Sequence, residues 1–253
     1  MIEVTAEGRV LRVALNRPEQ RNALNIATCR ELLEIFERAE ADPGVGAVVL
    51  CGHGTSFCSG MDLAEVLAAD QSELAGLHER LFTTIQRART PMVAAVHGGV
   101  MAAGVGLVAN SHLVVSAPEA KFGLTEIRIG LWPMMVYRAV ARAIGERRAT
   151  ELSLTGRVFS AEEALGFGLV TEVSVEPLVR GMALAQGIAM FSPKAIASGL
   201  ECAHLTRDLS WEEAAPVARE MRAELMASAD FTEGVRAFLE KRAAVWPSLA
   251  GND

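Results

Sequence analysis

The chain has 253 residues, of which 51% are hydrophobic, 22% charged and only 5% aromatic. This composition supplies a large aliphatic core and excludes wholesale disorder. The net charge of -7 argues against nucleic acid or an anionic membrane as the main partner. No apolar run reaches the roughly 18 residues that a membrane-spanning helix needs.

The N-terminus and the cysteines indicate the compartment. Residues 1–15 alternate like a strand and lack the basic start and apolar stretch of a signal peptide. The cysteines are scattered, and no group of His, Cys and Asp has the spacing of metal ligands, so we expect no metal. A soluble protein of a reducing compartment, the cytoplasm, is therefore expected. The four cysteines are Cys29, Cys51, Cys58 and Cys202.

The first half of the chain predicts strands alternating with helices. Residues 1–15 read as a hairpin, and residues 25–41 as a helix with one apolar face. Residues 45–52 form an apolar run typical of a buried parallel strand. After a glycine-rich loop, apolar residues three and four apart predict a second helix between Leu74 and Ala88.

The alternation continues before the pattern becomes helical. Residues 92–99 and 112–118 are expected to be strands, with a short helix over 102–110 between them. Such alternation predicts right-handed crossovers and a largely parallel sheet. From about residue 134 onward the pattern is mainly helical, so we predict an α/β core with a helical C-terminal appendage.

The helical region carries several N-terminal signals. Ser160–Glu163 and Ser210–Glu213 fit the capping box, and Ser192 precedes a proline suited to the first helical position. Asp230–Glu233 is expected to be a related start capped by Asp230. A long apolar stripe beyond about residue 195 exceeds what a lone surface helix needs, which predicts self-association. The stripe consists of Ala214, Val217, Met221, Leu225, Phe231, Val235 and Phe238.

Three glycine-rich segments lie where predicted strands end: residues 52–54, 57–62 and 97–104. Each could simply form a turn, but three together, each leading into a helix, favour backbone amides aimed at a ligand. Residues 104–109 also match the G-x-G-x-x-A dinucleotide pattern. That pattern should directly follow a strand, and here seven residues (97–103) intervene, so we do not expect a bound dinucleotide.

Among the acidic residues, Glu126 is distinctive because its neighbours are apolar and flanked by glycine. A carboxyl group in such a place tends to have a raised pKa and suits proton transfer. An ion pair with Arg128 or a helix cap is the alternative. Nucleophilic catalysis is poorly supported, because there is no G-x-S-x-G and Cys58 has no histidine placed as its base. His97 and His112 fit structural roles equally well.

Ordered motifs along nearly the whole chain resemble the enoyl-CoA hydratase/isomerase (crotonase) superfamily. The resemblance implies an α/β fold, a crotonase-like spiral core of repeated ββα units with a C-terminal helical trimerisation region. We expect a catalytic core over residues 1–195 and an oligomerisation region over 196–253. The motifs are Asn16–Pro18, Arg21–Asn25, Phe57–Leu63, Val96–Gly98, Ala103–Gly104, Lys121–Glu126, Leu154–Gly156, Ser160–Ala164, Gly168–Val170 and Asp230–Arg242.

The resemblance also implies the site. Members of this family bind acyl-CoA thioesters and stabilise an enolate in an oxyanion hole of two backbone amides, which by position would be Met61 and Ala103. A glycine-lined turn and a helix N-terminus suit that role. Coenzyme A is part of the substrate, so no separate cofactor is expected. The residues implied in binding it are Arg21, Ala23, Leu24, Ser59, Gly60, Asp62, Leu63 and Gly104, with Phe238 and Lys241 reaching a neighbouring subunit's ligand. The implied assembly is a homotrimer or a dimer of trimers.

Two departures from the family pattern bear on the reaction. Family hydratases carry two glutamates; the second is Glu126, but the position of the first, twenty residues earlier, is Gly106. The usual glycine-rich stretch after the second glutamate is replaced by residues 131–135, whose bulky Trp132, Met134 and Met135 should reshape the acyl pocket. The related thioester dehalogenases place a nucleophilic Asp near Met134, and its absence argues against that chemistry.

One base is enough to move a double bond, so the sequence favours isomerisation of a 3-enoyl-CoA to a 2-enoyl-CoA with Glu126 as the proton shuttle. A hydratase that has recruited another acid is the alternative, for which His97, Tyr137 or Glu119 are candidates. An acyl-CoA-binding protein with a decayed site is the non-enzymatic alternative. A cleft blocked by Trp132 or Met135 would favour decay.

Overall fold

The computed structural model describes residues 1–67 and 71–250. Its strands form a six-stranded sheet in the order β1-β2-β3-β5-β7-β10 and a four-stranded sheet in the order β4-β6-β8-β9. The strands are β1 (Ile2–Glu7), β2 (Val10–Leu15), β3 (Ala47–Gly52), β4 (Ser56–Cys58), β5 (Met92–Val96), β6 (Gly99–Met101), β7 (Leu113–Ser116), β8 (Lys121–Gly123), β9 (Val158–Ser160) and β10 (Glu172–Val173).

Helices alternate with the strands and then make up the C-terminal part of the chain. The α-helices are α1 (Ile26–Ala41), α2 (Leu63–Val66), α3 (Gln71–Gln86), α4 (Ala103–Asn110), α5 (Met134–Ile144), α6 (Glu146–Thr155), α7 (Ala161–Phe167), α8 (Pro177–Ala189), α9 (Pro193–Thr206), α10 (Trp211–Met226) and α11 (Ala229–Glu240). Short 3₁₀ helices are η1 (Pro18–Gln20), η2 (Glu126–Ile129) and η3 (Pro247–Ala250).

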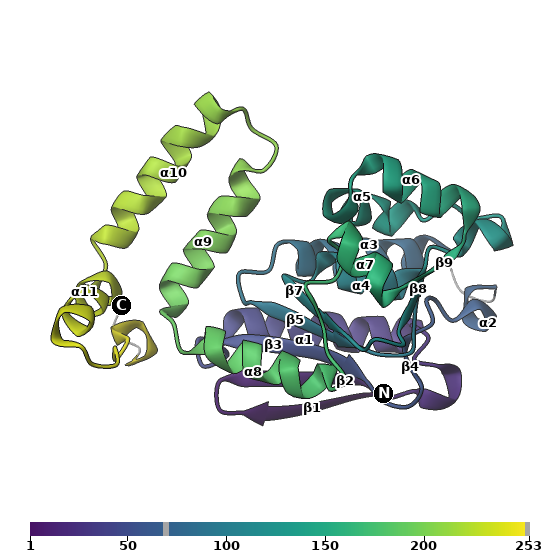
Figure 1. Ribbon diagram of the computed structural model, residues 1–253, viewed down its shortest axis with the longest axis horizontal. Coiled ribbons are helices and arrows are strands. Elements are labelled where there is room, and N and C mark those ends of the chain that lie inside the picture. The colour runs from purple at the N-terminus through teal and green to yellow at the C-terminus, as the bar shows by residue number, and fades with distance from the viewer. Residues whose placement is uncertain (68–70, 251–253) are drawn as a thin grey trace.

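The core is a spiral of repeated units. The chain crosses from the large sheet to the small one three times, through β3 and β4, β5 and β6, and β7 and β8, and each crossing leads to a helix (Figure 1). Parallel pairing joins β3 to β5 and β5 to β7, and likewise β4 to β6 and β6 to β8. The predicted α/β fold of ββα units is confirmed.

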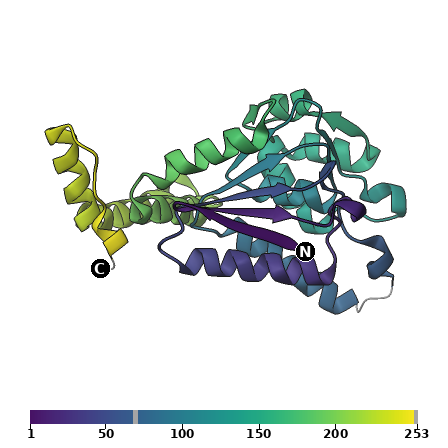
Figure 2. The ribbon, with the colours of Figure 1, turned by 90° about the horizontal axis from the view of Figure 1, so that it is seen from below.

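Strand β3 shows why the central strands read as continuous apolar runs. Val48 and Leu50 belong to the core on the side of α1, while Ala47, Val49 and Cys51 pack on the other side with α8. Figure 2 shows the large sheet lying between α8 and α1. Because both faces of this strand are buried, neither face can carry the polar residues that would produce alternation.

The N-terminal hairpin is confirmed, since β1 and β2 pair antiparallel from Ile2–Leu15 to Glu7–Val10. Both predicted capping boxes are present, at Ser160 and Ser210. The predicted Asp230 cap is wrong.

Helix α11 begins at Ala229 with Ser228 as its cap, and Asp230 lies inside the first turn. The carboxylate of Asp230, 2% exposed, accepts hydrogen bonds from the hydroxyl of Ser192 and from the amide and hydroxyl of Ser248. It therefore ties the start of α9 and the C-terminal segment to α11, a role that a capping pattern does not reveal.

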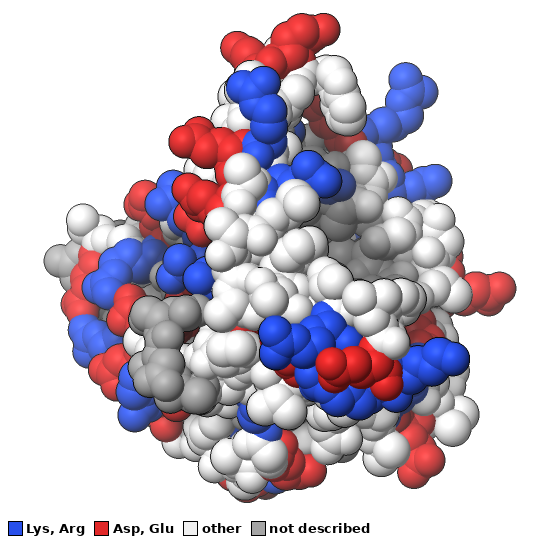
Figure 3. Space-filling model, turned by 90° about the vertical axis from the view of Figure 1, so that its left-hand side faces the viewer, with Lys and Arg blue, Asp and Glu red and all other residues white. Residues whose placement is uncertain are grey.

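Helices α9, α10 and α11 form an arm that extends away from the core in both ribbon views (Figures 1 and 2). Helices α9 and α10 have no buried residue, and apolar side chains such as Trp211 (85% exposed) and Leu239 (73% exposed) face outward. Viewed from the arm end, uncharged surface runs across the middle of the face, with charged groups around it (Figure 3). Among the described residues, no helix is both long and apolar enough to cross a membrane. The assignment of a catalytic core and an oligomerisation region stays a prediction.

We expect the arm to bind other copies of this chain, because apolar patches of this kind mark interaction sites. Light scattering at micromolar concentration should give the mass of a trimer or of two trimers, and Leu239→Asp should shift that mass towards the monomer. Val175→Asp is the matched control, because Val175 is 84% exposed and lies outside the arm. It should leave the mass unchanged. A monomeric unmodified protein would contradict the prediction.

Candidate active site

The N-terminus of α4 lies very close to the loop that follows β4. Gly60 has a φ of +102°, and a Cβ built on it would lie 2.9 Å from the Ala102 Cβ and 3.8 Å from the Ala103 nitrogen. A Cβ on Gly104 would lie 2.7 Å from the Cys58 carbonyl oxygen. Both positions therefore require glycine, and the contact brings Met61, the next residue after Gly60, beside the first turn of α4.

Two backbone amides are left without acceptors at this junction. The neighbouring amide of Asp62 donates to Leu24 and that of Ala102 donates to Gly123, at 2.9 and 2.8 Å. Within residues 1–67 and 71–250, the amides of Met61 and Ala103 have no such partner. Both residues line one pocket. Donors already oriented and not otherwise engaged can stabilise a developing oxyanion, which is the role proposed for them.

The loop before α1 is bonded to the loop before α2. The Ser59 amide donates to the Arg21 carbonyl at 3.0 Å, and the Leu24 amide donates to the Gly60 carbonyl at 2.8 Å. Arg17 bonds the Ala23 carbonyl at 2.6 Å and the Asp62 carboxylate at 3.0 Å. The structure thus brings together the residues implied in binding coenzyme A that lie in residues 21–24 and 59–62.

The buried side chain of Asn22 links the loop before α1 to the loops around β4. Its side-chain nitrogen donates to the carbonyls of His53 and Ser56, both at 2.8 Å, and its side-chain oxygen accepts from the Arg17 amide. Asn22 has a φ of +56°, a conformation that asparagine tolerates better than most residues. Sequence reasoning did not assign a separate role to this residue.

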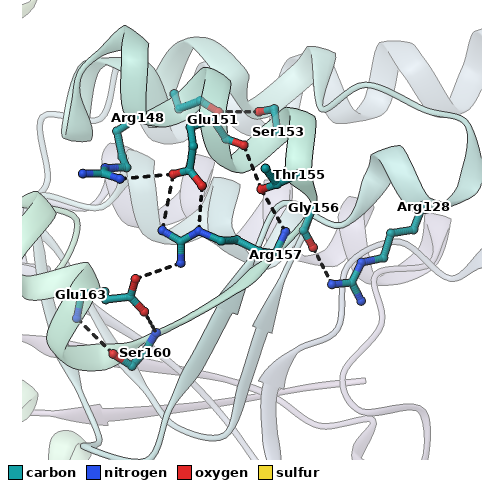
Figure 4. Close-up of polar contacts among 10 residues, drawn as sticks. Arg128, Arg148, Glu151, Ser153, Thr155, Gly156, Arg157, Ser160 and Glu163 are labelled. Atoms are coloured by element: carbon teal, nitrogen blue, oxygen red, sulfur yellow. Dashed lines mark hydrogen bonds and ion pairs between the residues drawn. The ribbon is translucent and has the colours of Figure 1, made fainter.

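Glu126 opens η2 and is only 5% exposed. Burial raises the pKa of its carboxyl group, and its own backbone amide offsets part of that rise. Its Oε2 is buried without a hydrogen-bond partner. The alternative ion pair with Arg128 is not formed: Arg128 instead donates to the Gly156 carbonyl at 2.6 Å (Figure 4). Within the part of the chain that the structure describes, Oε2 of Glu126 is therefore left without a protein partner.

The position of the missing glutamate is filled by apolar side chains. A Cβ on Gly106 would lie 2.2 Å from Val136 Cγ1 and 3.0 Å from Phe82 Cε1. Since even a methyl group does not fit, no carboxylate can project from position 106 unless Val136 and Phe82 move. Among the described residues that line the pocket, Glu126 is the sole carboxylate.

The pocket has a volume of about 280 Å³ and lies between α3, α5, the start of α4 and η2. Trp132, Met134 and Met135, the predicted acyl-pocket residues, all line it. The indole of Trp132 packs against Tyr137 with ring centroids 5.7 Å apart. The bulky residues thus form a wall and leave space beside Glu126, which favours a working cleft over a blocked one.

His78 also lines this pocket, and sequence reasoning missed it. It is 4% exposed, its Nε2 is buried without a partner, and burial lowers its pKa. It lies four residues after Leu74 and four before Phe82, so helical spacing places all three on one face. That spacing is the signal in the sequence, but the same apolar face predicts a purely structural helix.

The three groups considered as substitutes for the missing glutamate lie elsewhere. Nε2 of His97 bonds the Gly54 carbonyl at 2.9 Å, the Tyr137 hydroxyl bonds Thr150 at 2.7 Å, and Glu119 is exposed. None of the three lines the pocket.

The remaining predicted ligand contacts also lie apart from the pocket of their own chain. Leu63 begins α2 and is 47% exposed, while Phe238 and Lys241 lie at the end of the arm. A role for Phe238 and Lys241 at a neighbouring subunit's ligand stays a prediction.

Comparison with known proteins agrees with this geometry. A family model described as enoyl-CoA hydratase/isomerase matches residues 5–248. The chain belongs to this family. A Thermus thermophilus relative whose name gives it as an enoyl-CoA hydratase is 37% identical over 96% of this chain and 98% of its own length.

Other members are similar over comparable lengths. The rat mitochondrial Δ(3,5)-Δ(2,4)-dienoyl-CoA isomerase is 32% identical and covers 95% of this chain and 80% of its own. The crystal structure of a Mycobacterium smegmatis enoyl-CoA hydratase superposes with a TM-score of 0.91 at 34% identity, covering 97% of this chain and 98% of that one. Family enzymes that resemble this chain therefore carry both hydratase and isomerase names.

The oxyanion assignment is tested by removing one amide hydrogen. Ala103→Pro deletes the amide donor. Proline fixes φ near -65°, which suits the first position of a helix, so α4 should still form. Loss of one such donor typically reduces turnover by about 10² to 10³, so this variant should be nearly inactive on enoyl-CoA substrates while its mass is unchanged. The matched control is Ala103→Ser, which keeps the amide and should remain active. Normal turnover by Ala103→Pro would refute the assignment.

Burial of Glu126 predicts a shifted pH profile. A base must be deprotonated, and the pKa of this carboxyl group is raised, so activity should be lost as the pH falls through a value above the ordinary glutamate pKa of about 4.3. The measurement is kcat/KM against pH, which should show an acid limb of unit slope. An acid limb at or below the ordinary value, in an otherwise stable protein, would contradict the prediction.

Proposed function

We propose that this protein isomerises a 3-enoyl-CoA to a 2-enoyl-CoA with Glu126 as the only proton shuttle. The observation that carries the proposal is the filling of the Gly106 position by Val136 and Phe82, together with the finding that Glu126 is the one carboxylate among the pocket-lining residues that the structure describes. Hydration in this family divides the work between two carboxylates, whereas moving a double bond needs one base that removes a proton and returns it.

The proposed reaction proceeds in two proton transfers. The thioester carbonyl oxygen accepts hydrogen bonds from the Met61 and Ala103 amides, which stabilise negative charge on that oxygen. The Glu126 carboxylate removes a proton from C2, giving a dienolate. The same carboxyl group then delivers the proton to C4 as the double bond forms between C2 and C3. A raised carboxyl pKa suits both steps, because it strengthens the base and keeps the proton available.

The shape of the site supports the path of the substrate. Met61 and Ala103, whose amides are the proposed donors, line the same pocket as Glu126, Trp132 and Met135. A thioester held at the amides would therefore place its acyl group in that pocket. The bonded loops at residues 21–24 and 59–62 are the proposed seat of coenzyme A.

Hydration of a 2-enoyl-CoA is the second candidate. It is favoured by the name of the Thermus thermophilus relative and by the presence of His78, a second polar side chain in the pocket. In that reaction one group must orient and deprotonate water while another delivers a proton to C2, so both Glu126 and His78 would be needed.

A matched panel of 2-enoyl- and 3-enoyl-CoAs separates the two reactions. The purified protein should isomerise the 3-enoyl thioesters, with slow or undetectable hydration of crotonyl-CoA. Glu126→Gln keeps the side-chain volume but removes the base, and should lower isomerisation by at least about 10²-fold. Glu162→Gln, an exposed change on α7, is the control and should leave the rate unaltered. Efficient hydration by the unmodified protein, or full isomerisation by Glu126→Gln, would show the proposal to be wrong.

A further inference from the structure

Two buried polar atoms in the pocket have no partner within residues 1–67 and 71–250. They are Oε2 of Glu126 and Nε2 of His78, which come from η2 and from α3 respectively. Both residues line the same cavity of about 280 Å³. The proposed proton transfer uses Glu126 and gives His78 no task.

The surroundings of His78 offer it no hydrogen bond. The pocket residues around it are largely apolar, including Leu74, Phe82 and Val136, and the ring of Phe82 lies 6.4 Å from the imidazole, centroid to centroid. Glu126 does not supply the partner, since no hydrogen bond or ion pair joins the two side chains in the described structure. A buried polar atom without a partner is unfavourable, so a ligand that supplies the missing partner gains affinity.

We propose that His78 recognises an uncharged oxygen, a hydroxyl or a carbonyl, on the acyl group beyond C4. This inference rests on the proposed function, because it assumes that the thioester lies at the Met61 and Ala103 amides. With C2 to C4 held beside Glu126 for reaction, the acyl chain beyond C4 is the part that continues along the pocket wall. The substrate class is therefore an oxygenated 3-enoyl-CoA, not a plain alkyl one.

The charge state of the pocket selects an uncharged group. Burial favours the neutral imidazole, which has one donor and one acceptor nitrogen and so matches a hydroxyl in either direction. A carboxylate on the acyl group would lose its hydration in an apolar cavity that already holds the Glu126 carboxyl group. We therefore expect discrimination against both alkyl and carboxylate groups.

Binding of saturated acyl-CoAs tests the inference without any turnover. Calorimetry compares hexanoyl-CoA with its 5-hydroxy, 6-hydroxy and 5-oxo derivatives, with adipyl-CoA as the charged analogue. The unmodified protein should bind at least one of the three uncharged oxygenated ligands about 10-fold more tightly than hexanoyl-CoA. It should bind adipyl-CoA no more tightly than hexanoyl-CoA.

Three variants assign the preference to the imidazole. His78→Phe keeps a ring but removes both nitrogens, and should abolish the preference while hexanoyl-CoA still binds. His78→Gln restores a donor and an acceptor, and should recover part of the preference. Leu77→Met, a volume-conserving change at a core position of the same helix that does not line the pocket, should leave it unchanged.

The outcomes distinguish this inference from the proposed function. Equal binding of all ligands by the unmodified protein, or a preference that survives in His78→Phe, would overturn the inference even if isomerisation is observed. Calorimetry of 3-hydroxyhexanoyl-CoA, the product that hydration would give, completes the panel. A preference for this ligand alone would also overturn the inference, because the imidazole would then contact the oxygen on C3. If isomerisation is absent but the His78-dependent preference for an oxygen beyond C4 is found, the proposed reaction fails and the assignment of the acyl contact stands.

Discussion

The close approach of the β4 loop to the first turn of α4 is the constraint on which the site depends. Gly60 and Gly104 make it possible, because a Cβ at either position would lie within 3.0 Å of neighbouring atoms. A side chain at either position would push the loop and the helix apart and separate the Met61 and Ala103 amides. The parallel pairing of β4 with β6, irregular between Ser56 and Cys58, holds the two segments side by side, so the small sheet acts chiefly as a frame for these two donors.

The chemistry of the pocket follows from a second steric relationship. Val136 from α5 and Phe82 from α3 occupy the space that a side chain at Gly106 would need. No carboxylate can therefore project from position 106 unless they move. Burial separately raises the pKa of Glu126. Both features agree with the proposed single-base chemistry.

The sequence predicted the core well because its signals are local. Apolar runs, turn residues and capping boxes report on neighbours a few residues away, and these determined the strands, the hairpin and most helix starts. The glycine loops were found because they lie at the ends of predicted strands, and Glu126 because its neighbours are apolar; the resemblance to a family then gave them implied roles.

What the sequence did not reveal depends on contacts between distant segments. His78 was assigned no role from the sequence, and only the packed structure shows that it lines the same pocket as Glu126. Asp230 matched a capping pattern, but Ser228 takes that role and Asp230 binds Ser192 and Ser248 instead. In both cases the residues that define the surroundings come from distant segments of the chain, which no local pattern reports.

The distribution of satisfied and unsatisfied polar groups separates the frame from the pocket. Around the pocket, Arg157 is bonded to both Glu151 and Glu163, and Arg128 anchors η2 to the Gly156 carbonyl (Figure 4). Exposed ion pairs of this kind contribute little stability individually, but together with the backbone bond they restrict the segment that carries Glu126. Inside the pocket the situation is reversed, because polar atoms of buried side chains have no partner. The hydrogen bonds of the surrounding segments are formed, whereas the polar atoms inside the pocket lack protein partners. This arrangement is expected when a ligand supplies the missing hydrogen bonds, because the protein then needs little rearrangement on binding.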